Sequence, residues 1–425
     1  MTRIACIALA ALFAAVSLFA QPVRNGPLPQ PLPLFPPDNW WNTDVSAAPV
    51  DPNSASFIDF IGTTRGMHPD FGGDSGDPSY PIYGLPYIVV AGNQPRVPVT
   101  FEYADESDYA APTGPPGYPI PNEAKTEQKW IEGGLAGGDP SADGDRHMLI
   151  VDRDNRILFE VFATRWNATA GRWEGGSGAI FPLDSNQRRP DGWTSADAAG
   201  LAILPGLVRY DEASGDGPIR HALRVTVRAT NGYVFPGSHR AGSTVGALPM
   251  GARLRLKASK DISGFPEPVR KIFQAMKTYG LIVADNGSDL YVTGAYDTRW
   301  NNDILNPAFR AMTASDFEII QLGWQPSSQP PCMAPIISMQ PSGGTIRKGS
   351  VAILSVAAAG TEPLTVRWFR GVPDDISAEV GTGFSVAVAP TATTSYWARV
   401  SNGCGATDSQ AATVTVLSRR RAARR

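Results

Sequence analysis

The sequence lacks the short motifs that mark several common enzyme classes. It contains no GxSxG nucleophile elbow, no HExxH zinc helix, no P-loop and no dinucleotide-binding glycine fingerprint. Each of these motifs places a nucleophile, a metal or a phosphate at one defined turn or helix. Their absence argues against serine-esterase, zinc-peptidase and nucleotide chemistry. Beyond residue 20 there is also no apolar run long enough to cross a membrane.

An excess of positive charge is missing as well. The formal net charge is −3, and this total includes five arginines near the C-terminus (Arg419, Arg420, Arg421, Arg424 and Arg425). The rest of the chain is therefore more acidic than the total indicates. A protein that binds nucleic acid needs a basic surface, so we expect no nucleic acid partner.

Cysteine is scarce, with 3 residues, and Cys6 lies in an N-terminal segment that has the features of a secretory signal. In residues 1–20, Arg3 gives the positive start, an apolar stretch runs from Ile4 to Phe19, and Ala20 is small enough to precede a cleavage site. A membrane anchor is the alternative, but the run is short for a bilayer span and leads into a Pro-rich segment. We expect cleavage, no membrane span in the mature chain, and a secreted protein, extracellular or periplasmic.

The composition favours many short strands over helices. The 425 residues include 43 Gly and 38 Pro, and both residue types interrupt helices and mark turns. Changes in composition divide the chain into a Pro-rich lead-in (21–38), a large β-rich domain (39–326), a Pro/Ser linker (327–335), a small domain (332–417) and a basic, disordered tail (418–425).

The segment from Cys332 to Val416 has strand patterns at the spacing of a β-sandwich. Trp368 lies in the middle of one of these strands, where a sandwich keeps a core aromatic. The segment resembles the bacterial immunoglobulin-like repeats appended to secreted proteins. The resemblance rests on Cys332, Trp368 and the stretch TTSYWARVSNGCGATDS. This resemblance implies a spacer or weak binder without catalytic residues, and it ties Cys404 to Cys332. The same disulfide is expected because removal of Cys6 leaves an even pair of cysteines in an exported chain.

The large domain shows strand patterns at 147–152, 156–165, 219–228, 252–259, 281–286 and 289–295, and the turn Asp152–Asn155 predicts a hairpin. One helix is strongly indicated in PEPVRKIFQAMKTYG, and a shorter one is expected from Thr194, with Asp197 in a capping-box position. We therefore expect a mostly β fold, with a large β-sandwich or jelly-roll-like domain and few helices.

Several stretches of the large domain look like a family of secreted bacterial proteins. They are NWWNTDVSAAPVDPNS, DRHMLIVDRDN, RPDGWTSADAAGLAILPGLVRYDE, IRHALRVTV and ADNGSDLYVTGAYDTRW. The resemblance implies an extracellular setting and a shared fold. It assigns no catalytic residue to this chain.

Four histidines, all in the large domain, are the candidates for proton transfer: His68, His147, His221 and His239. His147 opens a strand directly after Asp145 and Arg146 and a Gly- and Asp-rich loop, a place where a scaffold presents functional side chains. A structural, hydrogen-bonded histidine is the alternative at each position, above all for His221 on its apolar strand face. We expect Asp145, Arg146 and His147 near a concave surface, completed by His221 as a further catalytic residue or by His239 as a substrate-binding residue.

Two strands are expected to carry cations on one face. Arg220, Arg224 and Arg228 alternate with apolar residues on one strand, and Arg253, Arg255 and Lys257 on another. Neighbouring carboxylates could simply pair with them. Alternatively, the two strands form a groove for an acidic chain, because guanidinium groups suit the carboxylates of uronic acids.

These features predict a secreted carbohydrate-active enzyme, a polysaccharide lyase or hydrolase. Its expected partner is an extracellular polysaccharide, neutral or acidic, or a cell-surface glycan. In a lyase, His147 or His221 is the base and an arginine neutralises the uronate. In a hydrolase, two carboxyl groups flank the sugar. The alternative function is a non-enzymatic glycan-binding or adhesion protein. The sequence leaves the cofactor unknown. The loop DFGGDSGD misses the calcium-loop spacing, so no metal-binding residue is predicted.

Overall fold

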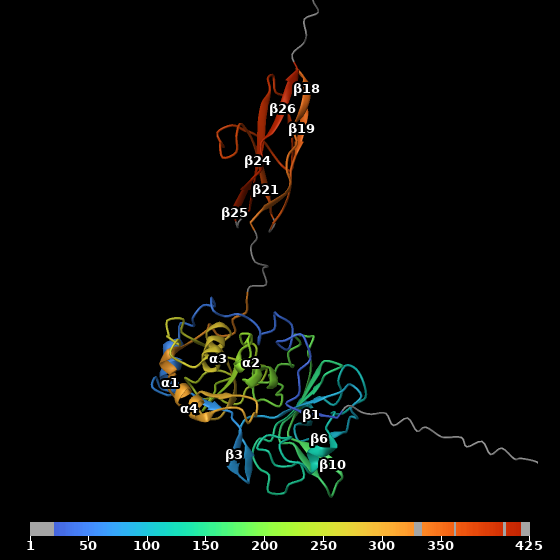
Figure 1. Ribbon diagram of the computed structural model, residues 1–425, viewed down its shortest axis with the longest axis vertical. Helices are drawn as coiled ribbons and strands as arrows, with labels where there is room; N and C mark the ends of the chain where they lie inside the picture. The colour runs from blue at the N-terminus through green and yellow to red at the C-terminus, as the bar shows by residue number, and fades with distance from the viewer. Residues whose placement is uncertain (1–20, 327–333, 361–362, 403–404, 418–425) are drawn as a thin grey trace, which may run out of the picture. The chain divides into compact units, whose positions relative to one another are not determined.

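The computed structural model describes residues 21–326, 334–360, 363–402 and 405–417, and the chain divides into two compact units after Pro326. Figure 1 shows the two units. The predicted signal peptide, all three cysteines and the basic tail lie outside the described residues. The predicted disulfide therefore remains a prediction.

A five-stranded sheet forms one half of the large unit. Its order is β1-β5-β7-β8-β11, with β5 and β7 parallel and the other pairs antiparallel. The predicted hairpin is confirmed, because β7 and β8 pair from Asp152 opposite Ile157. The strands are β1 (Val23–Arg24), β5 (Tyr87–Val90), β7 (Met148–Asp152), β8 (Ile157–Val161) and β11 (Gly178–Pro182).

A six-stranded mixed sheet forms the other half, in the order β16-β13-β14-β12-β15-β2. Within it β12 runs parallel to β14, and a bulge shifts their register between Val225 and Thr226. The strands are β2 (His68–Asp70), β12 (Leu223–Val227), β13 (Arg253–Leu256), β14 (Leu281–Asn286), β15 (Tyr291–Thr293) and β16 (Phe317–Ile319).

One hydrophobic core lies between these sheets. Leu149 and Leu158 of the first sheet belong to the same buried cluster as Leu223, Leu254 and Leu281 of the second. A second cluster fills the opposite face of the five-stranded sheet, where the small sheet β6-β10-β9 packs (Val99–Phe101, Arg172–Gly175 and Arg165–Asn167). The five-stranded sheet is thus apolar on both faces, which explains why its strands are almost continuously hydrophobic.

The Pro-rich lead-in is part of the large unit. Through β1 it pairs with β5, and Leu34 and Phe35 are buried in the main core. A short hairpin of β3 (Asp74–Asp77) and β4 (Tyr80–Ile82) projects from the same unit (Figure 1).

Helices cover one side of the large unit (Figure 1). The indicated amphipathic helix is confirmed as α3 (Glu267–Thr278), which buries Val269, Ile272, Phe273 and Met276. The others are α1 (Ser54–Ile61), α2 (Tyr210–Ser214), α4 (Asn302–Arg310) and 3-10 turns at Ala104–Glu106, Asn122–Lys125, Leu204–Gly206 and Ala314–Asp316.

The prediction of a helix that begins at Thr194 is wrong. Residues 194–202 form turns and irregular backbone, with Gly200 at a φ of 74°. The carboxylate of Asp197, expected as a capping group, is instead bound to Arg224. A long-range ion pair has therefore overridden the local helix pattern.

The small unit has its own core around Trp368. Val366, Trp368 and Val400 are buried together, and the Trp368 indole N–H donates to Gly383 O at 2.8 Å. Its main sheet is β18-β26-β24-β21-β22, with β25 beside β24, and two strand pairs, β17-β20 and β19-β23, complete it. The strands are β17 (Ile336–Met339), β18 (Gly344–Arg347), β19 (Ala352–Ser355), β20 (Ala357–Ala359), β21 (Thr365–Arg370), β22 (Glu379–Thr382), β23 (Ser385–Val388), β24 (Thr394–Asn402), β25 (Gly405–Asp408) and β26 (Ala412–Leu417).

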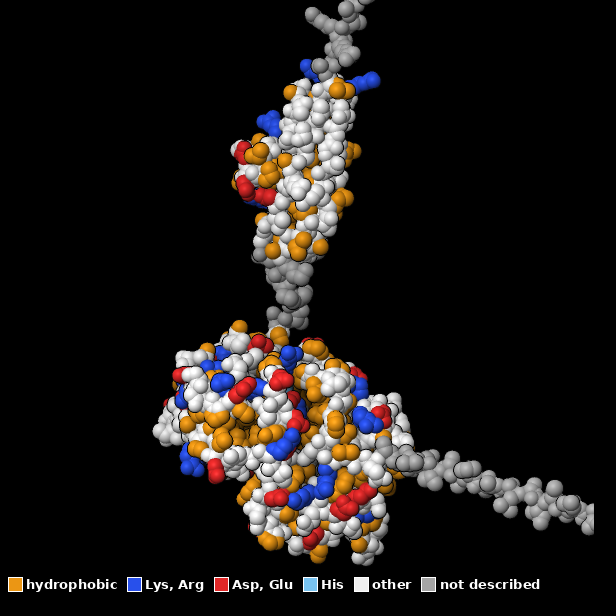
Figure 2. Space-filling view, viewed as in Figure 1, with side chains coloured by type: hydrophobic (Ala, Val, Ile, Leu, Met, Phe, Trp, Pro, Cys, Tyr) orange, Lys and Arg blue, Asp and Glu red, His pale blue; other side chains and the backbone are white. Residues whose placement is uncertain are grey.

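The protein is mostly β, with several sheets and few helices. On the face seen in Figure 2, basic and acidic side chains are interspersed over the large unit, without a broad patch of either sign. Across the described ranges, no helix combines the length and the apolar character that a bilayer span requires.

Candidate functional site

A pocket of about 420 Å³ opens in the large unit. Its ionisable lining consists of three carboxylic residues and two histidines: Glu106, Asp145, Asp285, His147 and His239. Aromatic side chains of Tyr103 and Phe162 and the small residues of the loop 194–198 complete the wall. Lys and Arg are absent from the described residues that line it, so the pocket suits a neutral or basic ligand better than an anionic one.

His147 lines this pocket but is almost fully buried. Its Nδ1 lies 2.6 Å from the carboxylate of Glu132, and its Nε2 lies 2.9 Å from the carbonyl oxygen of Ala196. Both partners only accept hydrogen bonds, so the geometry calls for a ring protonated on both nitrogens. Burial by itself would lower the pKa of His147, but Glu132 outweighs it and raises the pKa to about 9. His147 is therefore a cation without a free lone pair, and it is poorly suited to the role of general base.

The two residues before His147 have different surroundings. Asp145 lines the pocket. Arg146 is buried, with a φ of 47°, and its guanidinium donates to the carbonyl oxygens of Ala136 at 2.9 Å and Thr164 at 3.1 Å. The structure thus places Asp145 and His147 together at the pocket and turns Arg146 into the fold.

A buried arginine holds two carboxylates below the pocket. Arg224 donates Nε and Nη2 to Asp197, both at 2.8 Å, and Nη2 also lies 3.1 Å from Asp285. Its Nη1 donates to Thr293 at 2.7 Å. Because the guanidinium makes two hydrogen bonds to Asp197, the Asp197 carboxylate neutralises most of the positive charge of Arg224.

Asp285 is the carboxyl group of this cluster that reaches the pocket. Burial is the main cause that raises its pKa, to about 6, and the neighbouring Asp197 adds to the effect while Arg224 opposes it. Its side chain keeps 22% of its exposure. Asp285 can therefore exchange a proton with a ligand near neutral pH, which a general acid must do.

His239 offers the free ring nitrogen that His147 lacks. Its Nδ1 lies 2.9 Å from the carbonyl oxygen of Ala198, which fixes the proton on Nδ1 in the neutral ring. Within the described residues, Nε2 has no hydrogen-bond partner, and the half-buried ring lines the pocket. The sequence suggested His239 as a binding residue; its geometry also suits proton transfer.

The other predicted histidine, His221, lies away from this pocket. It is buried, with Nε2 at 3.1 Å from Glu212 and Nδ1 at 2.8 Å from the carbonyl oxygen of Ala222. The structure does not bring it together with His147. Glu212 also binds Arg209, so His221 belongs to a separate buried charge cluster.

The predicted cationic groove is not formed. The strands β12 and β13 flank β14 on opposite sides, and Arg220 is exposed ahead of β12. Arg224 is bound to Asp197 and Asp285, and Arg255 binds Glu318 and the carbonyl oxygens of Val45, Ser46 and Ala48. Arg253 lies outside the pocket, in a separate slot. Of the predicted cations, only Arg224 lies within β12, and only Arg253 and Arg255 lie within β13. Carboxylates distant in sequence pair with Arg224 and Arg255.

The floor of the pocket is an irregular loop held from below. The carboxylate of Glu160 accepts the backbone N–H groups of Ile203 at 2.8 Å and Leu204 at 2.9 Å, and burial raises the pKa of Glu160 to about 7. Earlier in the chain, His147 binds Ala196 O and Arg224 binds Asp197. Buried polar groups therefore fix the irregular residues 194–203 and the start of the 3-10 turn that follows them.

Sequence reasoning missed Glu132, Glu106 and the special position of Asp285. Asp285 directly follows the apolar run LIVA. This pattern marks the end of a strand, but it does not show that the strand ends at a pocket. Among the described residues no group of three or more His, Cys, Asp or Glu side chains is placed to hold a metal. Asp74, in the loop considered for calcium, instead pairs with Lys129 at 2.7 Å and accepts from Tyr296 at 2.8 Å.

Comparisons with known proteins give matches to immunoglobulin domains. No family model and no curated protein matches the chain. Among solved structures, the chain is similar to the I67–I69 fragment of the titin I-band (16% identity, TM-score 0.17), covering 20% of this chain and about a third, 32%, of that one. It is also similar to titin domain M7 (20% identity, TM-score 0.18; 21% of this chain and 99% of that one) and to Sidekick-1 immunoglobulin domains 1–5 (16% identity, TM-score 0.19; 25% and 28%). At these scores, the matches carry no inference about function.

Proposed function

We propose that the protein is a secreted carbohydrate-active enzyme that hydrolyses an extracellular glycan in the pocket of Asp285. The observation that supports this most is that Asp285, with its raised pKa, shares one pocket with Glu106 and Asp145. Glycoside hydrolysis uses one carboxylic acid to protonate the leaving oxygen and a second carboxylate to activate water or attack the sugar.

In this proposal Asp285 is the acid, and Glu106 or Asp145 is the second carboxylate. Glu106 is held by the backbone N–H of Thr194, which donates to its Oε2 at 2.9 Å. Arg224 is a positioning residue, since it orients Asp285 without lining the pocket. His239 can take or return a proton through Nε2.

Hydrolysis fits the pocket better than a lyase reaction. A lyase needs a base and a cation that neutralises the uronate carboxylate. The two histidines predicted as bases, His147 and His221, have both ring nitrogens occupied by acceptors. His239 has a free Nε2, but the described lining contains no Arg or Lys to neutralise a uronate. The setting proposed for this reaction is outside the cell, with the small unit as a spacer of the bacterial immunoglobulin-like type.

A non-enzymatic glycan-binding protein is the second candidate. It is favoured by an exposed aromatic side chain in the pocket, because such rings stack on sugars. Tyr103 lines the pocket with 47% of its surface exposed.

A panel of polysaccharides incubated with the full chain distinguishes the two candidates. We expect new reducing ends with at least one glycan, and a loss of about 100-fold or more for Asp285→Asn, the range of general acid catalysis. Asp59→Asn, an exposed change of the same chemistry on α1, is the matched control and should leave the rate unchanged. Normal turnover by Asp285→Asn would reject the acid, whereas binding without turnover would favour the second candidate.

A further inference from the structure

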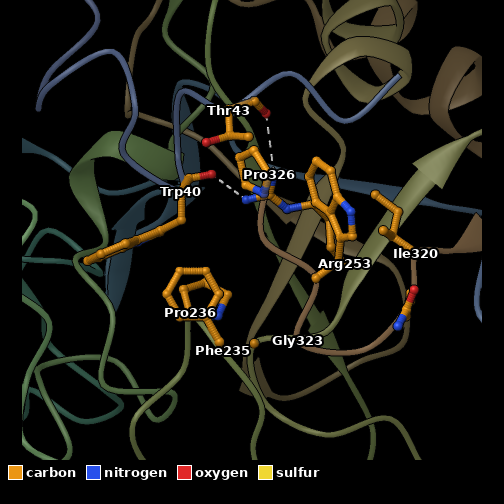
Figure 3. A pocket seen from close by; sticks show the side chains of 11 residues that line it. Trp40, Thr43, Phe235, Pro236, Arg253, Ile320, Gly323 and Pro326 are labelled. Atoms are coloured by element: carbon orange, nitrogen blue, oxygen red, sulfur yellow. Dashed lines mark hydrogen bonds between the residues drawn. The ribbon is translucent and has the colours of Figure 1, made fainter. Parts of the chain in front are cut away.

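A narrow aromatic slot lies apart from the pocket, at the end of the large unit where Pro326 lies (Figure 3). Trp40, Phe235 and Trp324, from three distant parts of the chain, form its walls together with prolines. About 30 Å³ of the slot is open to the centre of a water-sized sphere. One water molecule needs about 10–15 Å³ on this measure, so only a group of a few atoms can enter.

Arg253 of β13 lies in this slot. Its guanidinium donates to the carbonyl oxygens of Thr43, at 3.4 Å, and Trp40, the two bonds that are dashed in Figure 3. An arginine has five N–H donors, so most of its donors remain for another acceptor.

The charge of Arg253 has no counterion among the described residues. By contrast, Arg224 and Arg255 of the same sheet pair with the carboxylates of Asp197 and Glu318, and Arg228, just after β12, pairs with that of Asp289. Burial lowers the pKa of Arg253, and no carboxylate offsets this effect. A cation taken from water without a partner is costly, and an incoming anion would remove that cost.

The shape of the slot specifies the anion. A guanidinium binds a carboxylate through two parallel hydrogen bonds. The enclosed space admits a carboxylate group but not a sugar ring, which would remain outside, against an aromatic wall that includes the half-buried Trp324. A carboxylate attached to a ring that stacks on an aromatic wall is the chemistry of a uronic acid.

The slot and the pocket are neighbours on one sheet. Arg253 and Arg224 are both in register with Ile282, so the three side chains share a face across three strands. Two strand spacings separate the arginines, about 10 Å, and Arg224 contacts Asp285 in the pocket. The segment from Phe235 to His239 lines both sites.

We propose that the slot of Arg253 binds the carboxylate of a uronic acid residue, as a subsite for an acidic sugar beside the pocket of Asp285. This extends the proposed function by naming an acidic sugar in the glycan. The link between the slot and the pocket rests on the proposed function. The binding of a uronate in the slot does not, because it can be measured without turnover.

The test uses the full chain with trimers of galacturonate, mannuronate and glucuronate, and with their methyl esters, titrated by calorimetry. The ester keeps the sugar ring and removes the charge. We expect at least one trimer to bind at least about 10-fold more tightly than its ester, which corresponds to one charge-assisted hydrogen-bonded pair. Arg253→Gln should abolish this preference, and Arg65→Gln, which removes an exposed charge elsewhere, should preserve it.

A second variant separates binding from folding, because Arg253 also holds the backbone at Trp40 and Thr43. Trp324→Leu leaves the guanidinium in place and should weaken the acid and the ester alike, with an unchanged circular dichroism spectrum. Equal affinity for acid and ester, failure of all three trimers to bind, or full competition by acetate would overturn the uronate assignment. If the trimers bind as expected but no glycan is hydrolysed, the slot stands and the proposed reaction fails.

Discussion

Replacing Glu132 by Gln tests how much the buried imidazolium of His147 stabilises the large unit. Glu132 accepts hydrogen bonds from both the backbone N–H and the ring of His147. An amide in its place removes the charge that favours a doubly protonated ring. A neutral ring has a single N–H, which can stay with Ala196 O while the Nδ1 lone pair accepts the new amide N–H. The amide nitrogen then also faces the backbone N–H of His147, which loses its acceptor.

The size of the effect follows from the pKa of His147, which is about 9 in the folded chain against 6.5 for the free side chain. At about 1.4 kcal/mol for each pKa unit, this difference corresponds to roughly 3 kcal/mol of unfolding free energy. Because the folded pKa is the higher one, the stabilisation is fully present below pH 6.5 and is lost as the pH rises through about 9.

Guanidinium unfolding followed by tryptophan fluorescence provides the assay, since 8 of the 10 tryptophans precede residue 327. Between pH 6.5 and pH 10, the unfolding free energy of wild type should fall by roughly 3 kcal/mol more than that of Glu132→Gln. The two curves of stability against pH should therefore converge at alkaline pH. His147→Gln should also flatten the profile. Parallel curves for wild type and both variants would refute the doubly protonated ring.

Three further outcomes are expected. Arg224→Leu should lower the unfolding free energy by about 3–5 kcal/mol, because Asp197 is left buried without its partner; a loss below about 1 kcal/mol in denaturant titrations would contradict this. If Asp285 acts as the acid, the rate should fall as the pH rises above about 6, where that carboxyl loses its proton, and a flat pH–rate profile would exclude the role. Thiol titration of the denatured, unreduced mature protein should find no free thiol if Cys332 and Cys404 are bonded, whereas two thiols per chain would reject the disulfide.

Local patterns in the sequence were sufficient for elements whose contacts are local or follow one face. The helix α3 repeats its apolar residues at helical spacing, and the hairpin of β7 and β8 is set by the turn at Asp152–Asn155. Trp368 lies on the core face of its strand. Each of these features depends on residues near one another in the chain.

The site depends on contacts that no local pattern shows. The Ala196 carbonyl that occupies His147 is 49 residues away, and the Asp197 carboxylate that occupies Arg224 is 27 residues away. The parallel pairing of β12 with β14, and the bulge that places Asp285 beside Arg224, likewise arise from tertiary packing. The sequence thus located strands and charges, but it could not show which charges were already neutralised.

The loop beneath the pocket has a consequence for how the site can change. It is anchored by Glu160, His147 and Arg224 through its backbone and through Asp197, whereas Ser195, Ala196 and Ala198 contribute to the lining. The groups that hold the loop are thus largely different from the side chains that line the pocket. Ala198 can therefore be exchanged for a larger or more polar residue while the contacts that hold the loop stay in place. Such a loop is a platform for altering ligand preference, in evolution or by design, without rebuilding the sheets that carry it.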